Sequence, residues 1–185
     1  MKKTLTIVAF LMATTIFVDC VKEKDKRFLI AKDSVGKLKR SDLIKDIESI
    51  YAQDSIVRDT TALNIGNSTK KLKIYEKGGK HLLTITPTSD SIPGIENLRI
   101  FDPRFISDKG VGLASTFKDI RENYAIRKIV TSRNNVVLFV KDSDVYFTIS
   151  KEELPASLRY AASTDIEAVQ IPDKARIKYM MVGWE

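Results

Sequence analysis

The sequence predicts an α+β protein made of two tandem units, in each of which a short helix packs on a meander of antiparallel strands. A weak internal repeat relates residues 28–51 to residues 104–124, with an offset of 76 residues at first and 73 after a gap. Each copy is followed by several β-rich segments that turn residues separate. Because a helix and a sheet must each bury one apolar face, this order favours helices packed on antiparallel sheet.

The repeat contains the two predicted helices. It matches Val35-Gly36 with Val111-Gly112, Ile47 with Ile120, and Tyr51 with Tyr124. In the first copy we expect a helix over residues 41–51, with Ser41 as its N-cap. In the second we expect a helix over residues 116–124, where Thr116 and Asp119 have the spacing of a capping box. Apolar residues at helical spacing give each helix one face that can pack on a sheet.

The predicted strands are short runs rich in β-branched and aromatic residues. They cover residues 55–59, 71–76, 81–86 and 95–101 in the first unit, and residues 126–131, 136–141, 145–149 and 175–182 in the second. Gly78-Gly79 is typical of a hairpin turn, since glycine readily adopts positive φ. In the last strand we expect Ala175, Ile177, Tyr179 and Met181 to share one face.

Residues 1–19 have the order of a secretory signal peptide. Lys2 and Lys3 precede an uncharged, mostly apolar run from Leu5 to Val18. This run is shorter than the roughly 20 residues that a membrane-spanning helix needs. Cys20 follows it and is the only cysteine of the chain. A single cysteine cannot form a disulfide within the chain, so another role is expected.

The arrangement resembles bacterial lipoprotein precursors, whose first mature residue is a cysteine that receives acyl chains, palmitate among them. The resemblance implies lipidation at Cys20, although Asp19 stands where Gly, Ala or Ser is usual. Val21 takes the place of the Asp that retains such proteins in the inner membrane. This implies an outer-membrane lipoprotein that faces either the periplasm or the exterior. The alternative is an ordinary secreted protein with an unmodified cysteine.

The positive charge is concentrated near the expected anchor. The net charge is +7, but residues 21–40 alone hold eight basic and three acidic side chains. The remainder of the mature chain is nearly neutral, so we expect no nucleic-acid binding. We expect residues 20–40 to be a basic tether, which either contacts anionic headgroups or is simply solvated. Residues 41–185 are then expected to form a single globular domain that contains most of the repeat.

A second resemblance concerns the middle of the chain. Ile95, Leu98 and Ile100 lead into Asp102-Pro103, then Gly110-Val111-Gly112, then a helix that begins near Ser115-Thr116. This pattern resembles the sigma-E-regulated lipoprotein family of unknown function. More loosely it resembles the tandem helix-plus-sheet units of β-lactamase-inhibitor-like and outer-membrane-assembly lipoproteins. The resemblance covers about residues 30–150 and implies an envelope protein without established catalysis.

Residues typical of catalytic sites are few. His81 is the only histidine, and no cysteine other than Cys20 is present, so neither a catalytic triad nor a zinc ligand set is expected. We expect no metal and no cofactor. A polar loop with Asp102, Arg104, Asp108 and Lys109 is a candidate binding loop, because loops often carry function. The alternative is that these side chains form salt bridges with one another at the surface.

Four short segments match the Asp-Ser/Thr-aliphatic (or Thr) acceptor pattern of a bacterial O-glycosylation system. The acceptor residues would be Ser34, Ser55, Thr60 and Ser91. Asp-Ser pairs are also common in turns, which is the alternative interpretation.

Together these patterns predict a non-catalytic, membrane-anchored envelope lipoprotein that binds or assembles with another envelope component. One alternative is a hydrolase or carbohydrate-active enzyme that uses a carboxylate pair, such as Asp102 with Asp119 or Glu122. Another is a periplasmic protein that binds a small hydrophobic ligand between helix and sheet.

Overall fold

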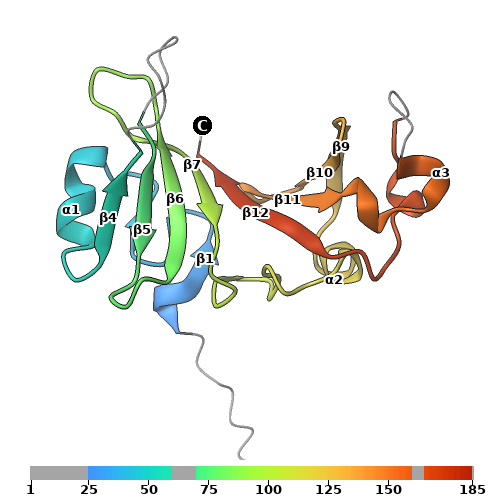
Figure 1. Cartoon of the computed structure of the whole chain (residues 1–185), viewed down its shortest axis with the longest axis horizontal. Coiled ribbons are helices and arrows are strands. Elements are labelled where there is room, and N and C mark those ends of the chain that lie inside the picture. The colour runs from blue at the N-terminus through green and yellow to red at the C-terminus, as the bar shows by residue number, and fades with distance from the viewer. Residues whose placement is uncertain (1–24, 60–69, 160–164, 185) are drawn as a thin grey trace, which may run out of the picture.

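The computed structural model describes residues 25–59, 70–159 and 165–184, and it confirms the predicted α+β class (Figure 1). Within these ranges the strands form one eight-stranded and one four-stranded sheet. Short helical segments and the small sheet share a single hydrophobic core with the large sheet. The predicted signal peptide, Cys20 and Thr60 lie outside the described residues.

The eight-stranded sheet consists of two meanders placed side by side. The first contains β4 (Ser55–Arg58), β5 (Leu72–Tyr75), β6 (His81–Pro87) and β7 (Ile95–Ile100), and the second contains β9 (Ile126–Thr131), β10 (Asn135–Val140), β11 (Val145–Ser150) and β12 (Ile177–Gly183). The strand order is β4-β5-β6-β7-β12-β11-β10-β9. The last strands of the two meanders therefore pair, antiparallel, with Met180 opposite Ile100. Figure 1 shows β4–β7 in one half of the molecule and β9–β11 in the other, with β12 between them.

Each meander follows a short helix. The first helix consists of a 3-10 turn, η2 (Ile44–Asp46), that continues into α1 (Ile47–Ile50), and the second is α2 (Phe117–Asn123). The predicted N-cap Ser41 is wrong, since the residue before η2 is Leu43, which makes no side-chain capping bond. Instead the N–H of Ile44 donates to the carbonyl of Pro93 at 2.9 Å, so a tertiary contact satisfies it. The predicted capping box of α2 is present. Further short helical segments are η1 (Lys26–Phe28), η3 (Lys151–Glu153), α3 (Ala156–Arg159) and η4 (Ala168–Gln170).

The core contains the residues that the repeat matches. Ile47 and Ile120 are fully buried, as are Tyr51 and Tyr124 apart from a few per cent of their surface. All four belong to one cluster with the inward side chains of the large sheet. The ring of Tyr124 contacts that of Phe147 on β11, with 5.9 Å between centroids, which fixes α2 over the second meander. The predicted burial of both isoleucines is confirmed.

The four-stranded sheet was not predicted. It consists of β1 (Leu29–Ala31), β2 (Ser34–Val35), β3 (Leu38–Lys39) and β8 (Ile106–Ser107), in the order β3-β2-β1-β8. Ile30, Val35 and Leu38 are buried in the core. A basic tether that reaches residue 40 is therefore wrong for this segment, and the globular domain begins at Leu29 or earlier. These strands contain only two or three residues, and lysines separate their apolar positions, so the sequence shows no strand pattern there.

Two glycines of the repeat allow the small sheet to pack closely. Gly36 has φ of +57°, and a Cβ placed on it would lie 2.4 Å from the carbonyl oxygen of Arg27. A Cβ on Gly112 would lie 2.8 Å from the carbonyl oxygen of Phe105. Both distances are too short for any other residue type, so the glycines are required by close backbone contact.

The large sheet has four register shifts, and those on β12 and β6 change which face the neighbouring residues occupy. The register between β11 and β12 shifts so that Thr148 pairs with Tyr179 and Ile149 pairs with Ile177. Lys178 is the extra residue, and it reverses the alternation of buried positions. Ala175 and Ile177 are buried, but after the shift it is Met180 that is buried, while Tyr179 and Met181 are half-buried on the other face. The predicted common face of Ala175, Ile177, Tyr179 and Met181 is therefore wrong. On β6 the register also shifts, leaving Leu82 as an extra residue between His81 and Leu83.

No helix among residues 25–59, 70–159 and 165–184 is long and apolar enough to cross a membrane.

Candidate functional site

The predicted polar loop divides into two parts with different environments. Asp102 and Arg104 form a salt bridge with 2.7 Å between Nη2 and Oδ2. Arg104 also donates to both carboxylate oxygens of Glu76 on the β5–β6 hairpin, and Lys80 lies 3.2 Å from Asp102. Asp102 is fully buried within this network, whereas its cationic partners are exposed.

The network holds Asp102 in its ionised form. Burial opposes the charge, but the side-chain and backbone hydrogen bonds from Arg104, together with Lys80, outweigh it and keep the pKa of Asp102 below its ordinary value. The same bonds raise the pKa of Arg104. The charge of Asp102 is therefore balanced by Arg104 and Lys80, and these ion pairs join the end of β7 to the β5–β6 hairpin.

Asp108 and Lys109 lie further along the chain, on an exposed turn after β8. Asp108 is attached to β1, because its N–H donates to the carbonyl of Ile30 at 2.8 Å. The ammonium of Lys109 lies 4.6 Å from the ring centroid of Tyr124, a cation–π distance. These contacts connect β1, β8 and α2.

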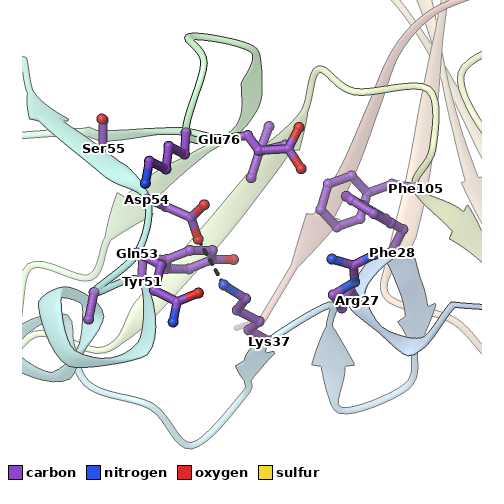
Figure 2. Close-up of a pocket in the computed structure, with 12 residues that line it drawn as sticks. Arg27, Phe28, Lys37, Tyr51, Gln53, Asp54, Ser55, Glu76 and Phe105 are labelled. Carbon is purple, nitrogen blue, oxygen red and sulfur yellow. Dashed lines mark hydrogen bonds and ion pairs between the residues drawn. The ribbon is translucent and has the colours of Figure 1, made fainter.

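A pocket of about 690 Å³ lies beside this network. Figure 2 shows the loop after α1, with Tyr51, Gln53 and Asp54, on one side, and Phe28 with Phe105 on the other. Phe28 and Phe105 meet edge to face, with 5.2 Å between ring centroids. Phe28 is the accessible aromatic side chain of the pocket, because Phe105 and Tyr51 are almost fully buried. The volume is in the range of about 300–1,000 Å³ that is typical of small-molecule sites.

Most charges at the pocket are already paired. Lys37 donates to Asp54 at 2.8 Å, and Arg27 binds Asp25 at 2.7 Å. Burial and the nearby carboxylates of Asp54 and Asp42 raise the pKa of Tyr51, which stays protonated. The pocket therefore offers mainly paired charges and polar groups, with little exposed aromatic surface.

A second surface covers the side of the eight-stranded sheet that faces away from the core. Residues in direct cross-strand register point to the same face, and one such line crosses seven strands from β5 to β9. It consists of Lys73, Thr84, Arg99, Met181, Tyr146, Phe139 and Lys128. We call this surface the open face. Aromatic, methionine and arginine side chains dominate its centre, which joins the two meanders.

Five planar groups stack on the first half of the open face. The ring of His81 lies between those of Tyr75 and Phe101, with centroid distances of 4.6 and 3.9 Å. The guanidinium of Arg99 follows, 4.7 Å from the Phe101 centroid and 3.9 Å from that of Tyr179. We call these five side chains the stacked row. They come from β5, β6, β12 and the end of β7, and the bulge at Leu82 turns His81 toward the others.

The sequence did not predict the stacked row. Its signal was present, since positions that alternate with core residues in the predicted strands are aromatic or cationic rather than small and polar. What the sequence lacks is the pairing of β7 with β12 and the bulge on β6, which together bring these residues into contact.

His81 is half-buried at the start of β6. Its Nε2 lies 3.1 Å from Oγ1 of Thr84. Burial lowers the pKa of His81 below its ordinary value of 6.5, and Lys73 and Arg99 act in the same direction. The part of the chain that the structure describes contains no cluster of three or more potential metal ligands.

The predicted glycosylation positions differ in accessibility. Ser55 and Ser91 are exposed, Ser34 is half-buried in β2, and Thr60 is outside the described residues. Ser55 also lines the pocket of Figure 2. Modification at any of them stays a prediction.

Comparison with known proteins gives a fold relationship. No protein-family model and no curated protein matches the chain. The crystal structure of the uncharacterised protein YfeY from Escherichia coli is similar, with a TM-score of 0.51 and 16% sequence identity. The match covers 83% of this chain and 98% of that one. At this identity the similarity concerns the fold alone, which this chain shares with an uncharacterised bacterial protein.

Proposed function

We propose that the protein is a non-catalytic lipoprotein of the bacterial envelope, anchored through Cys20, that binds another envelope protein with its open face. The anchor is inferred from the order of charged residues, apolar run and cysteine at the start of the sequence. The outer membrane is the proposed location, since Val21 follows Cys20.

The observation that carries the binding role is the composition of the open face. Tyr, Phe, Met and Arg are the residue types that protein interfaces favour at their centres. Here Tyr146, Met181 and Arg99 lie in one line across β11, β12 and β7. A sheet face that needed only to be soluble would carry short polar and charged side chains instead.

The carboxylates of the enzymatic alternative are already engaged. Asp102 is bound by Arg104 and Lys80. Asp119 accepts hydrogen bonds from the N–H and hydroxyl of Thr116 at 2.7 and 2.9 Å. Glu122 lies exposed, 3.7 Å from Lys118. The pKa values of Asp102 and Asp119 are lowered by these hydrogen bonds, whereas a general acid needs a raised pKa.

The pocket of Figure 2 favours a second candidate function, the binding of a small hydrophobic ligand. Phe28 supplies the accessible apolar contact area, and the buried rings of Phe105 and Tyr51 lie behind it. Saturable binding of an apolar dye that Phe28→Ala abolishes would support this candidate.

The contribution of basic residues to membrane binding is smaller than their number indicates. Lys37 is paired with Asp54 and Arg40 with Asp144. Attachment to the membrane therefore depends mainly on the lipid. In Cys20→Ser we expect loss of labelling by a fatty-acid probe and release from the membrane fraction, whereas unchanged labelling would refute the anchor.

Site-specific photocrosslinking in intact cells tests the open face. A photoreactive phenylalanine at Phe139 or Tyr146 should give a discrete crosslinked species. The same group at Val169, an exposed position on η4, serves as the control. Equal crosslinking from Val169, or none from the open face, would contradict the proposed function.

A further inference from the structure

We infer that the guanidinium of Arg99 binds a carboxylate side chain of the partner protein on the open face. The inference rests on the proposed function, because it names the group that the partner presents. Arg99 lies near the end of β7, opposite Thr84 on β6 and Met181 on β12, so it occupies an interior position of the sheet.

Arg99 differs from the other described arginines in its burial. Among residues 25–59, 70–159 and 165–184 it is the one arginine that is half-buried, while the others are exposed. Six of those exposed arginines form salt bridges: Arg27, Arg40, Arg58, Arg104, Arg121 and Arg176. Arg99 has no carboxylate within salt-bridge distance in the same ranges. The least exposed arginine is thus one that lacks a counter-charge.

The pocket around Arg99 is lined by basic and neutral residues. Arg99 lines this pocket of about 440 Å³, to which Lys71, Lys73 and His81 also contribute, and no Asp or Glu lines it. Lys73 is bound to Asp59 at 3.1 Å. Burial of a cation without a counter-charge is unfavourable, so a bound carboxylate would complete the site.

The geometry fixes the orientation of the guanidinium. Phe101 and Tyr179 lie against it at 4.7 and 3.9 Å, which restricts rotation of the side chain. Its Nε is buried without a hydrogen-bond partner. A planar guanidinium held by aromatic stacking is preorganised for bidentate binding of a carboxylate, and little rotamer entropy is lost when the bond forms.

A carboxylate of a protein fits this site better than a lipid phosphate. Arg99 is half-buried beside Met181, Tyr179 and Phe101, on an interior strand of the sheet. Long, exposed lysines at an edge would suit a lipid surface. A partner side chain inserted between aromatic rings instead matches the centre of a protein interface.

The experiment measures binding of a peptide of about 12 glutamates to the full-length protein by calorimetry at low ionic strength, where charge pairing is strong. Arg99→Gln should weaken binding about tenfold or more, because truncation of a partly buried charge pair mainly accelerates dissociation. Arg99→Lys, which keeps the charge but lacks the planar fork, should give an intermediate affinity. Arg133→Gln is the matched control with the same change of charge on an exposed turn, and it should leave affinity within about twofold. Thermal unfolding of each variant verifies that it folds.

Equal weakening by Arg99→Gln and Arg133→Gln would overturn the inference, since it would reflect net charge alone. Arg99-dependent binding to phosphatidylglycerol vesicles in place of the peptide would overturn it too and assign the site to lipid. Crosslinking from Phe139 separates the two proposals. If the crosslink persists at full yield in Arg99→Gln, the inference about Arg99 fails while the proposed function stands. If the unsubstituted chain gives no crosslink, the proposed function itself fails.

Discussion

The two halves of the molecule are alike on the inside and different on the outside. In each half a short helix places a buried isoleucine and a buried tyrosine on the core face of a four-stranded meander: Ile47 and Tyr51 in the first, Ile120 and Tyr124 in the second. The two meanders keep the same order and meet at β7 and β12. The repeat in the sequence is therefore a repeat of core positions.

On the open face the halves diverge. The first meander supplies most of the stacked row, including Tyr75, His81 and Arg99. The second supplies Tyr146 and Phe139, whose rings stack at 5.3 Å. The core constrains side-chain volume closely, whereas an open face can change with little loss of stability. The difference indicates that packing constraints kept the inside alike while the outside could diverge.

The largest expected effect tests the equivalence of the two cores. Ile47→Ala and Ile120→Ala should each lower the free energy of unfolding by about 2–5 kcal/mol, because each removes a fully buried side chain and leaves a cavity. Urea unfolding of the two variants measures this loss. Similar values would support equivalent packing despite the different helical geometry.

Solvent-facing positions on the same helical segments provide the controls. Lys45 is exposed on η2, and Arg121 is exposed on α2, where it forms a surface salt bridge with Asp173. Lys45→Ala and Arg121→Ala should each change stability by under about 0.5 kcal/mol. A silent isoleucine variant in either half would show that the halves do not share a packing scheme.

The eight strands of the large sheet could be predicted because their signals are local. Turn residues such as Gly78-Gly79 bound runs of β-formers, and every predicted strand overlaps an observed one. The small sheet could not be predicted, since β2 and β3 contain two residues each. β3 pairs with β2, β2 pairs with β1, and β1 in turn pairs with the distant β8. Non-local pairing leaves no periodic pattern in so short a segment.

The same distinction applies to the candidate site. Asp102 and Arg104 are close in sequence, so their mutual salt bridge was weighed as an alternative from the sequence alone. The network with Glu76 and Lys80 depends on the β5–β6 hairpin lying beside the end of β7. The stacked row depends on a bulge and on the junction between meanders. Composition identifies which side chains are unusual, but tertiary structure decides which of them meet.

A smaller effect should distinguish the two helices. In α2 the carboxylate of Asp119 accepts a hydrogen bond from the N–H of Thr116, and this bond lowers the pKa of Asp119. Asp119→Ala should therefore cost about 0.5–2 kcal/mol. Ser41→Ala should change the free energy of unfolding by under about 0.5 kcal/mol, because Ser41 does not cap η2. Comparable losses in the two variants would mean that the first helix is capped in solution as the second is.

The smallest expected effect is a pH dependence confined to the first half, which contains the only histidine of the chain. Burial lowers the pKa of His81 in the folded protein, whereas the unfolded chain takes up the proton near the ordinary value of 6.5. Between these two pKa values the unfolded state binds more protons. The contribution of His81 to stability is therefore fully present above pH 6.5 and declines as the pH falls below it.

His81→Phe isolates this contribution, because phenylalanine keeps a ring between Tyr75 and Phe101 but cannot titrate. All other ionisable groups are common to both proteins, so the difference between their urea-unfolding free energies, measured from pH 7.5 to 5, reports His81 alone. We expect the unsubstituted protein to lose stability relative to the variant as the pH falls. Parallel curves would mean that His81 is solvated like a surface histidine and that the stacked row is open. A relative gain at low pH would require a carboxylate beside His81, which would also contradict the uncompensated positive charge around Arg99.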